Sequence, residues 1–125
     1  MDKTPLILYV EDNLDNRKLV NRVLRASGFQ FIGVGDGRAA LNYVAAQTPD
    51  LILMDINLPD LDGYTVTTAM RQLTHLTQIP IVALTANVMQ ADREKSLAAG
   101  CNGFIQKPIN VDKLPEQIWD YLNRN

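Results

Sequence analysis

Short apolar runs alternate with amphipathic segments along the chain. Continuous apolar runs are typical of strands that are buried on both faces of a parallel sheet. The runs that predict strands lie at residues 6–10, 29–34, 51–54, 79–84 and 104–105.

Between these runs, apolar residues recur at the spacing of one helix face. The first three segments carry Leu19, Val20, Val23 and Leu24, then Ala40, Leu41, Val44 and Ala45, then Val66, Ala69, Met70 and Leu73. A fourth helix over 88–99 is poorer in large apolar residues, and Gly100 is expected to end it. A fifth carries Val111, Leu114, Ile118 and Leu122. Pro115 predicts a late or kinked start to this helix, because proline beyond the first turn removes a backbone hydrogen bond.

This alternation predicts an α/β fold with a parallel sheet and helices on both faces. The first, third and fourth runs are the most continuously apolar, which is typical of central strands, and the other two suit the edges. With right-handed crossovers we expect a flavodoxin-like, doubly wound five-stranded sheet in the order 2-1-3-4-5, with five helices. No linker or change in composition divides residues 1–125, so we expect one domain and no output domain.

The composition predicts a soluble, cytoplasmic protein. Hydrophobic residues make up 46% of the chain, which argues against disorder. No apolar stretch is long enough to span a membrane, and no signal peptide opens the sequence. The single cysteine, Cys101, cannot form an internal disulfide, which suits a reducing compartment. A net charge of −2 without a block of Lys or Arg argues against direct binding to nucleic acid.

Polar residues stand where the predicted strands end, at the edge where such sheets bind ligands. Glu11 and Asp12 follow the first strand and Asp55 the third, while Thr85 and Lys107 follow the fourth and fifth. Taken singly, each has a simpler interpretation as a helix-start acid, a turn residue, a helix cap or a solvated strand end. Their convergence on one edge favours a functional site.

Three carboxylates at one edge repel one another, so a compensating cation is expected. Carboxylate oxygens are ligands that Mg²⁺ prefers, and the backbone carbonyl of Asn57 is a further candidate. Lys107 adds a second positive charge. Both charges favour the ionised form that a carboxylate nucleophile needs, and both would neutralise charge on a transferred phosphoryl group. The sequence therefore predicts that Asp55 accepts a phosphoryl group and that Thr85 donates a hydrogen bond to one of its oxygens.

Four stretches of the sequence carry these residues. They are Glu11–Asp12, "LILMDINLPDLDGY" around Asp55, "IPIVALTAN" around Thr85–Ala86, and "CNGFIQKPI" around Lys107–Pro108. Together they resemble the receiver domain of two-component response regulators over the whole chain, and the set is far more specific than any one stretch.

The resemblance implies a partner and a cofactor. Asp55 would take its phosphoryl group from a phosphohistidine on a sensor histidine kinase or a histidine phosphotransfer protein. Glu11, Asp12, Asp55 and the carbonyl of Asn57 would hold Mg²⁺. Such a domain is not an enzyme that acts on other molecules, although it catalyses its own phosphoryl transfer and slow dephosphorylation.

The resemblance also implies a switch. Thr85 would move to meet the phosphoryl group, Lys107 would form an ion pair with it, and a cis peptide bond would precede Pro108. Phe104 stands at the position of the family's switch aromatic, although a plain packing role is the competing interpretation. Asn57 and Asn87 stand at positions that tune how fast water removes the phosphoryl group. We expect the weakly anchored fourth helix to be the element that changes.

Three rival functions can be compared with the residues of this sequence. A phosphatase of the haloacid dehalogenase type also forms an aspartyl phosphate, but it needs a second aspartate where Asn57 stands. A nucleotide-binding module would need a glycine-rich phosphate loop, which the sequence lacks. A degenerate receiver that acts only as a docking surface does not fit the intact acidic set. Within the family, the chain is a stand-alone regulator of an unknown target protein, a phosphorelay intermediate, or an excised receiver of a hybrid histidine kinase.

Overall fold

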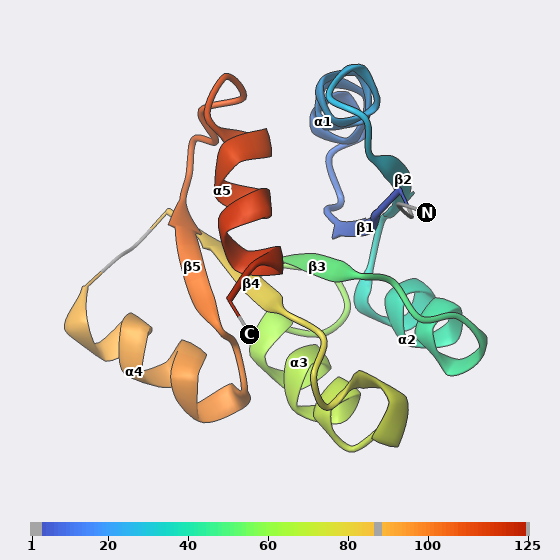
Figure 1. The fold of residues 1–125 in the computed structure, drawn as a ribbon. Helices are drawn as coiled ribbons and strands as arrows, with labels where there is room; N and C mark the ends of the chain where they lie inside the picture. The colour runs from blue at the N-terminus through green and yellow to red at the C-terminus, as the bar shows by residue number, and fades with distance from the viewer. Residues whose placement is uncertain (1–3, 87–88, 125) are drawn as a thin grey trace.

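The computed structural model describes residues 4–86 and 89–124. In this part of the chain, five parallel strands form one sheet in the order β2-β1-β3-β4-β5 (Figure 1). The strands are Leu6–Val10 (β1), Gln30–Val34 (β2), Leu51–Asp55 (β3), Ile81–Thr85 (β4) and Gly103–Gln106 (β5). The predicted strand order and the flavodoxin-like arrangement are confirmed.

Helices cover both faces of the sheet (Figure 1). They are Leu14–Ala26 (α1), Gly37–Ala46 (α2), Gly63–Arg71 (α3), Gln90–Ala99 (α4) and Leu114–Leu122 (α5), with a short 3₁₀ helix at Thr74–Leu76 (η1). α1 and α5 pack on one face, and α2 and α3 pack on the other. No helix among residues 4–86 and 89–124 is both long and apolar enough to cross a membrane.

Alternate side chains of the central strands supply the core on each face. Ile7 and Tyr9 of β1 join the core under α1 and α5, whereas Leu8 and Val10 join the core under α2 and α3. This follows from the two-residue period of a strand. Every residue of β3 and β4 is buried. The sheet therefore forms a rigid base, with its polar strand ends at one edge.

The helix boundaries follow local chemistry. α4 ends at Gly100, whose φ of 108° lies in the left-handed region, as the sequence predicts. α5 begins only at Leu114, so Pro115 falls in the first turn, where its missing N–H costs no intrahelical bond. The predicted late start is confirmed. Val88, the expected first residue of the fourth helix, lies outside the described residues.

Apart from one-residue shifts at the ends of β2, β3 and β5, two details differ from the sequence-based prediction. Leu19 was expected on the buried face of α1, but it is 44% exposed because this helix contacts the sheet through a narrower stripe at Val20 and Leu24. β4 begins at Ile81 rather than at residue 79. The reason is that the Ile79 N–H donates to the Leu76 carbonyl in the turn after η1 and is not part of the sheet ladder.

Candidate functional site

Three carboxylates meet where β1 and β3 end. β1 and β3 are in register at Val10 and Met54, so Glu11 and Asp55 leave the sheet side by side. Each of Glu11, Asp12 and Asp55 offers a carboxylate oxygen, and these oxygens all lie within 4.8 Å of one another. Glu11 and Asp55 are buried, whereas Asp12 is exposed. A buried carboxylate is costly unless hydrogen bonds or opposite charges compensate it.

The Asp55 carboxylate has a partner for each oxygen. Oδ1 accepts a hydrogen bond of 3.0 Å from the N–H of Asn57, and Oδ2 lies 3.2 Å from Lys107 Nζ. The same ammonium lies 3.7 Å from Glu11 Oε1. Lys107 thus supplies one positive charge to two buried carboxylates, and the third carboxylate stands at the open side of the cluster.

Lys107 is aimed at this cluster by the end of β5. Its backbone N–H donates to the carbonyl of Thr85 over 2.8 Å, which extends the pairing between β4 and β5 by one bond. The peptide bond between Lys107 and Pro108 is cis, as the resemblance implied. Thr85 itself is the last residue of β4 and is only 6% exposed. Thr85 therefore lies between Asp55, at the end of β3, and Lys107, which follows β5.

Tyr9 is a site residue that the sequence reasoning missed. Its hydroxyl donates to Glu11 Oε1 over 3.2 Å, and the Asn13 N–H donates to Glu11 Oε2 over 3.2 Å. Burial and the neighbouring Glu11 charge raise the pKa of Tyr9 above its ordinary value. One signal was present: a hydroxyl-bearing residue two positions before an acid shares its side of a strand.

The loop from β3 to α3 is braced at several points. Gly63 N–H donates to the Ile56 carbonyl, and a Cβ at Gly63 would collide with the carbonyl oxygen of Asp55. The Asp60 carboxylate accepts backbone N–H bonds from Gly37, Arg38 and Leu61, and these bonds lower the pKa of Asp60. The backbone that follows Asp55 is thereby tied to the start of α2.

Asp62 begins the helix that follows this loop. Its carboxylate accepts a hydrogen bond of 2.9 Å from the N–H of Thr65, which makes Asp62 the N-cap of α3. That backbone hydrogen bond is the main cause that lowers the pKa of Asp62. Asp60 therefore holds the loop after β3 in place, and Asp62 caps the start of α3.

The remaining candidates lie around this cluster. Asn57 is exposed, and its backbone N–H is the group that contacts Asp55. Phe104 lies half-buried on the edge strand β5, with the guanidinium carbon of Arg93 of α4 5.0 Å from the centre of its ring. Asn87 lies outside the described residues. Phe104 is thus placed between β5 and α4, the helix that was expected to change.

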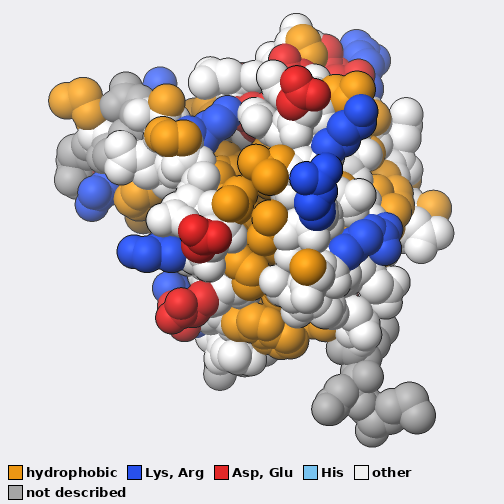
Figure 2. Space-filling view, turned by 90° about the horizontal axis from the view of Figure 1, so that it is seen from above, with side chains coloured by type: hydrophobic (Ala, Val, Ile, Leu, Met, Phe, Trp, Pro, Cys, Tyr) orange, Lys and Arg blue, Asp and Glu red, His pale blue; other side chains and the backbone are white. Residues whose placement is uncertain are grey.

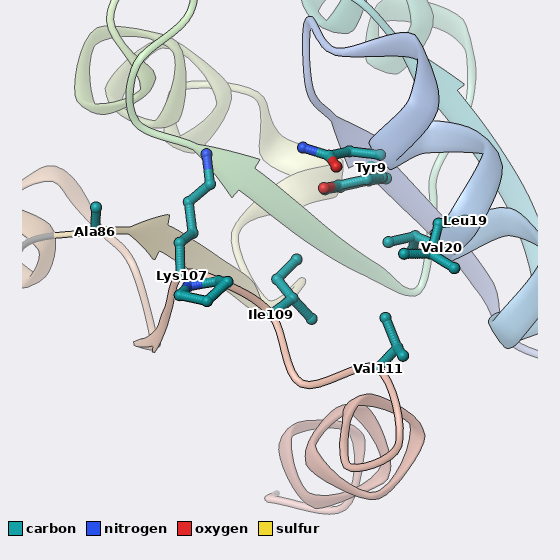
Figure 3. Close-up of a pocket in the computed structure, with 9 residues that line it drawn as sticks. Tyr9, Leu19, Val20, Ala86, Lys107, Ile109 and Val111 are labelled. Atoms are coloured by element: carbon teal, nitrogen blue, oxygen red, sulfur yellow. The ribbon is translucent and has the colours of Figure 1, made fainter.

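An apolar groove adjoins the cluster. A cavity of about 420 Å³ lies between α1 and the segment that joins β5 to α5, and its lining includes Tyr9, Leu19, Lys107, Ile109 and Val111 (Figure 3). Seen from above, hydrophobic side chains form a strip across the molecule, with Lys and Arg side chains along its right side (Figure 2). The groove brings an exposed apolar surface next to the ammonium that contacts Asp55.

Comparisons with known proteins agree with this geometry. The sequence profile of the response regulator receiver domain matches residues 7–119. The polar-differentiation response regulator DivK of Brucella ovis is 40% identical over 119 residues, which cover 95% of this chain and 97% of the relative.

Solved structures show the same fold. The chemotaxis response regulator CheY4 of Vibrio cholerae has a TM-score of 0.91 at 26% identity, over 95% of this chain and 99% of that one. The receiver domain of sensor histidine kinase PA1611 from Pseudomonas aeruginosa has a TM-score of 0.87 at 38% identity, over 96% and 98%. That structure has a magnesium ion coordinated in its active site cleft.

Proposed function

The chain belongs to the response regulator receiver domains of two-component systems, and from this we propose that Asp55 is its phosphoacceptor. One observation carries the proposal. The buried Asp55 carboxylate is held between the Asn57 N–H and the Lys107 ammonium, at an edge where two further carboxylates lie within 4.8 Å. This arrangement suits a nucleophile that takes up a phosphoryl group.

The same residues suit a magnesium ion. Three carboxylates from two neighbouring strand ends form an all-oxygen donor set beside the Lys107 ammonium, and oxygen atoms are the ligands that Mg²⁺ prefers. Glu11, Asp12, Asp55 and the backbone carbonyl of Asn57 would hold the ion. Bound there, Mg²⁺ supplies positive charge against the oxygens of the transferred group.

Phosphoryl transfer follows from the position of Asp55. A carboxylate oxygen of Asp55 attacks the phosphorus of a phosphohistidine, the P–N bond breaks, and the imidazole leaves with the bonding electron pair. Lys107 Nζ, which lies 3.2 Å from Asp55 Oδ2, stays beside the new acyl phosphate and neutralises one of its oxygens. Thr85, at the end of the adjacent strand, donates a hydrogen bond to another oxygen. In this way the domain catalyses its own modification, and we do not class it as an enzyme that acts on other molecules.

The phosphodonor is a protein that reaches the groove beside Lys107. We propose a sensor histidine kinase or a histidine phosphotransfer protein, in the cytoplasm. Leu14 and Leu19 of α1 are 54% and 44% exposed, so a partner helix has apolar surface to bury there. A helix seated in the groove brings a histidine on its side next to Asp55, because Lys107 and Tyr9 line both the groove and the acidic cluster.

The phosphorylated domain then changes its contact with a downstream protein. An acyl phosphate carries about two negative charges, by analogy with other phosphorylated residues, which is about one more than the carboxylate that it replaces. Charge-assisted bonds from Thr85 and Lys107 contribute about 1.5–3 kcal/mol each. Shifting a two-state equilibrium so that the rare state becomes dominant needs about 5.5 kcal/mol, which is comparable with the sum of these two bonds. Phe104 and α4 are the elements that respond, since Arg93 of α4 covers the Phe104 ring beside Thr85's strand.

A second role within the family also has support. The chain is 38% identical to the receiver domain of a sensor histidine kinase, as well as 40% identical to a regulator named for polar differentiation. A phosphorelay intermediate passes its phosphoryl group on to a second histidine, whereas a terminal regulator keeps it until water removes it. Incubating the phosphorylated chain with unmodified phosphotransfer proteins separates the two roles: back-transfer to histidine supports the relay.

Labelling with a small phosphodonor tests the proposed function. The chain is incubated with acetyl phosphate and Mg²⁺, and the adduct is located by mass spectrometry. We expect a mass increase of one phosphoryl group at Asp55, no labelling of Asp55→Asn, and normal labelling of the surface control Asp120→Asn. An Asp55→Asn variant that labels like the unmodified chain contradicts the proposal, and so does an unmodified chain that never labels.

A further inference from the structure

Tyr9 joins the hydrophobic core to the acidic cluster. Its side chain is fully buried, and its ring packs edge-on against Phe31 with the ring centres 6.2 Å apart. The same ring lines the groove between α1 and the β5–α5 segment (Figure 3). Its hydroxyl points from the core toward the acidic cluster, where it donates a hydrogen bond of 3.2 Å to Glu11 Oε1.

The Glu11 carboxylate is held on both sides. Oε1 takes the Tyr9 hydroxyl, and Oε2 takes the backbone N–H of Asn13 over 3.2 Å. A glutamate side chain has three rotatable bonds, and these two donors restrict their freedom. The carboxylate is thereby held with an oxygen beside those of Asp12 and Asp55 before any ion arrives.

The length of residue 11 matters for this contact. An aspartate at this position would be shorter by one carbon–carbon bond, about 1.5 Å. From an oxygen–oxygen distance of 3.2 Å, the hydroxyl of a ring fixed in the core would then lie beyond hydrogen-bond range. Tyr9 and Glu11 are therefore a matched pair, in which the hydroxyl reaches the longer acid only.

We propose that Tyr9 is a positioning residue for magnesium, whose hydroxyl orients the Glu11 carboxylate as a ligand. The proposal rests on the function proposed above, because it assumes that Glu11 is one of the metal ligands. Groups that hydrogen-bond to metal ligands typically change metal affinity about 10- to 100-fold when they are removed. Tyr9 would take this role from inside the core, through its hydrogen bond to Glu11.

Loss of the hydroxyl has a defined direction. In Tyr9→Phe the ring still fills the core, but Oε1 of Glu11 loses the donor at 3.2 Å and keeps only the Lys107 ammonium at 3.7 Å. Without this donor the carboxylate is no longer held in the orientation in which it lies beside the other two acids. Magnesium binding weakens as a result, while the acceptor Asp55 keeps its own two partners.

Isothermal titration calorimetry with Mg²⁺ on the unphosphorylated chain measures this effect directly. We expect the Kd of Tyr9→Phe to rise about 10-fold, and that of Tyr43→Phe to stay unchanged, because Tyr43 is a half-buried tyrosine on α2 outside the cluster. An unchanged or tighter Kd in Tyr9→Phe overturns the proposal. If the unmodified chain binds no Mg²⁺, the proposed function itself fails, so the two failures are distinguishable.

A double-mutant cycle separates positioning from general loosening of the core. In the Glu11→Asp background the hydroxyl has nothing within reach, so adding Tyr9→Phe should leave the Kd for Mg²⁺ unchanged. If Tyr9→Phe weakens binding equally in both backgrounds, it acts through the packing and not through Glu11, and the proposal is wrong. Acetyl phosphate labelling gives the matching kinetic readout: half-saturating Mg²⁺ rises in Tyr9→Phe, and the rate at saturating Mg²⁺ is retained.

A measurement on the unmodified chain needs no variant to fold. With tyrosines labelled at the hydroxyl-bearing ring carbon, the Tyr9 signal should move during a Mg²⁺ titration by nuclear magnetic resonance, because its hydrogen-bond acceptor becomes a metal ligand. The signal of Tyr43 should stay in place. A Tyr9 signal that does not respond while the chain binds Mg²⁺ overturns the proposal.

Discussion

The Nζ atom of Lys107 lies 3.2 Å from Oδ2 of Asp55, so an edge strand delivers a positive charge to the end of a central strand. The two residues are 52 positions apart in the sequence. Asp55 closes β3, and Lys107 follows β5, with β4 and its last residue, Thr85, between them. The ion pair is therefore a direct product of the strand order.

Removing this ammonium should destabilise the magnesium-free domain. Lys107→Gln leaves the buried carboxylates of Asp55 and Glu11 without their common positive charge, and we expect unfolding to become easier by about 1–3 kcal/mol. Urea unfolding without Mg²⁺ measures the loss, and saturating Mg²⁺ should narrow it. The exposed control Lys113→Gln should match the unmodified chain. A Lys107→Gln variant as stable as the unmodified chain without Mg²⁺ would show that this charge is dispensable.

A charge placed in the apolar groove should affect only protein phosphodonors. Leu19→Glu puts a carboxylate on the surface where we expect a partner helix, so transfer from a phosphorylated phosphotransfer protein should slow at least 10-fold, which corresponds to about 1.4 kcal/mol. Labelling by acetyl phosphate should be unaffected, because a small donor does not need the groove. Leu97→Glu, which alters an exposed leucine of α4, is the matched control and should leave both rates unchanged. If phosphoryl transfer slows equally with the protein donor and with acetyl phosphate, the substitution disturbs the site around Asp55 and not the docking of the partner protein.

The cap of α3 should lose its effect in acid. Asp62→Ala removes the oxygen that accepts the Thr65 N–H and should cost about 1 kcal/mol at neutral pH. The folded-state pKa of Asp62 is lowered from the ordinary 3.8, chiefly by that backbone hydrogen bond. Its stabilisation is therefore present above this value and is lost as the pH falls through the lower, folded-state pKa. Urea titrations of the unmodified chain and of Asp62→Ala at several pH values should show that their difference in free energy of unfolding shrinks below the ordinary pKa. A constant difference would mean that the carboxylate charge does not contribute to the stability of the cap.

Phosphorylation should change the dynamics of α4 and leave those of α2 unchanged. The C-terminal end of α4 is anchored, since Arg71 Nε donates to the Gly100 carbonyl over 2.9 Å. Arg93, nearer its start, rests on Phe104, which we expect to turn with the modification. Amide hydrogen exchange with and without the acyl phosphate should differ over residues 90–99 and agree over 37–46. Identical exchange of α4 in both states would rule this helix out as the responding element.

The sequence allowed the fold and the cluster to be predicted because both depend on strand composition. The central strands are continuously apolar and the edge strands are not, and together with right-handed crossovers this predicts the order that brings Glu11, Asp55 and Lys107 together. Hydrogen bonds between residues that are far apart in the sequence leave no comparable pattern in it. The contact of Asp60 with Gly37, 23 positions away, is one such hydrogen bond.

The error at Leu19 has the same origin. A helical pattern identifies apolar residues, but it does not tell which of them reach the sheet. In the structure α1 places Val20 and Leu24 in the core and leaves Leu19 exposed at the groove. A residue that the pattern assigned to packing thus becomes part of an exposed surface.

The bracing by Asp60 gives the molecule a stationary side. Because its carboxylate fastens the backbone after Asp55 to the first turn of α2, that helix cannot follow a rearrangement at β4 and β5 without breaking two hydrogen bonds. A spectroscopic label attached to α2 would therefore serve as a fixed reference point, against which displacements elsewhere in the domain can be measured.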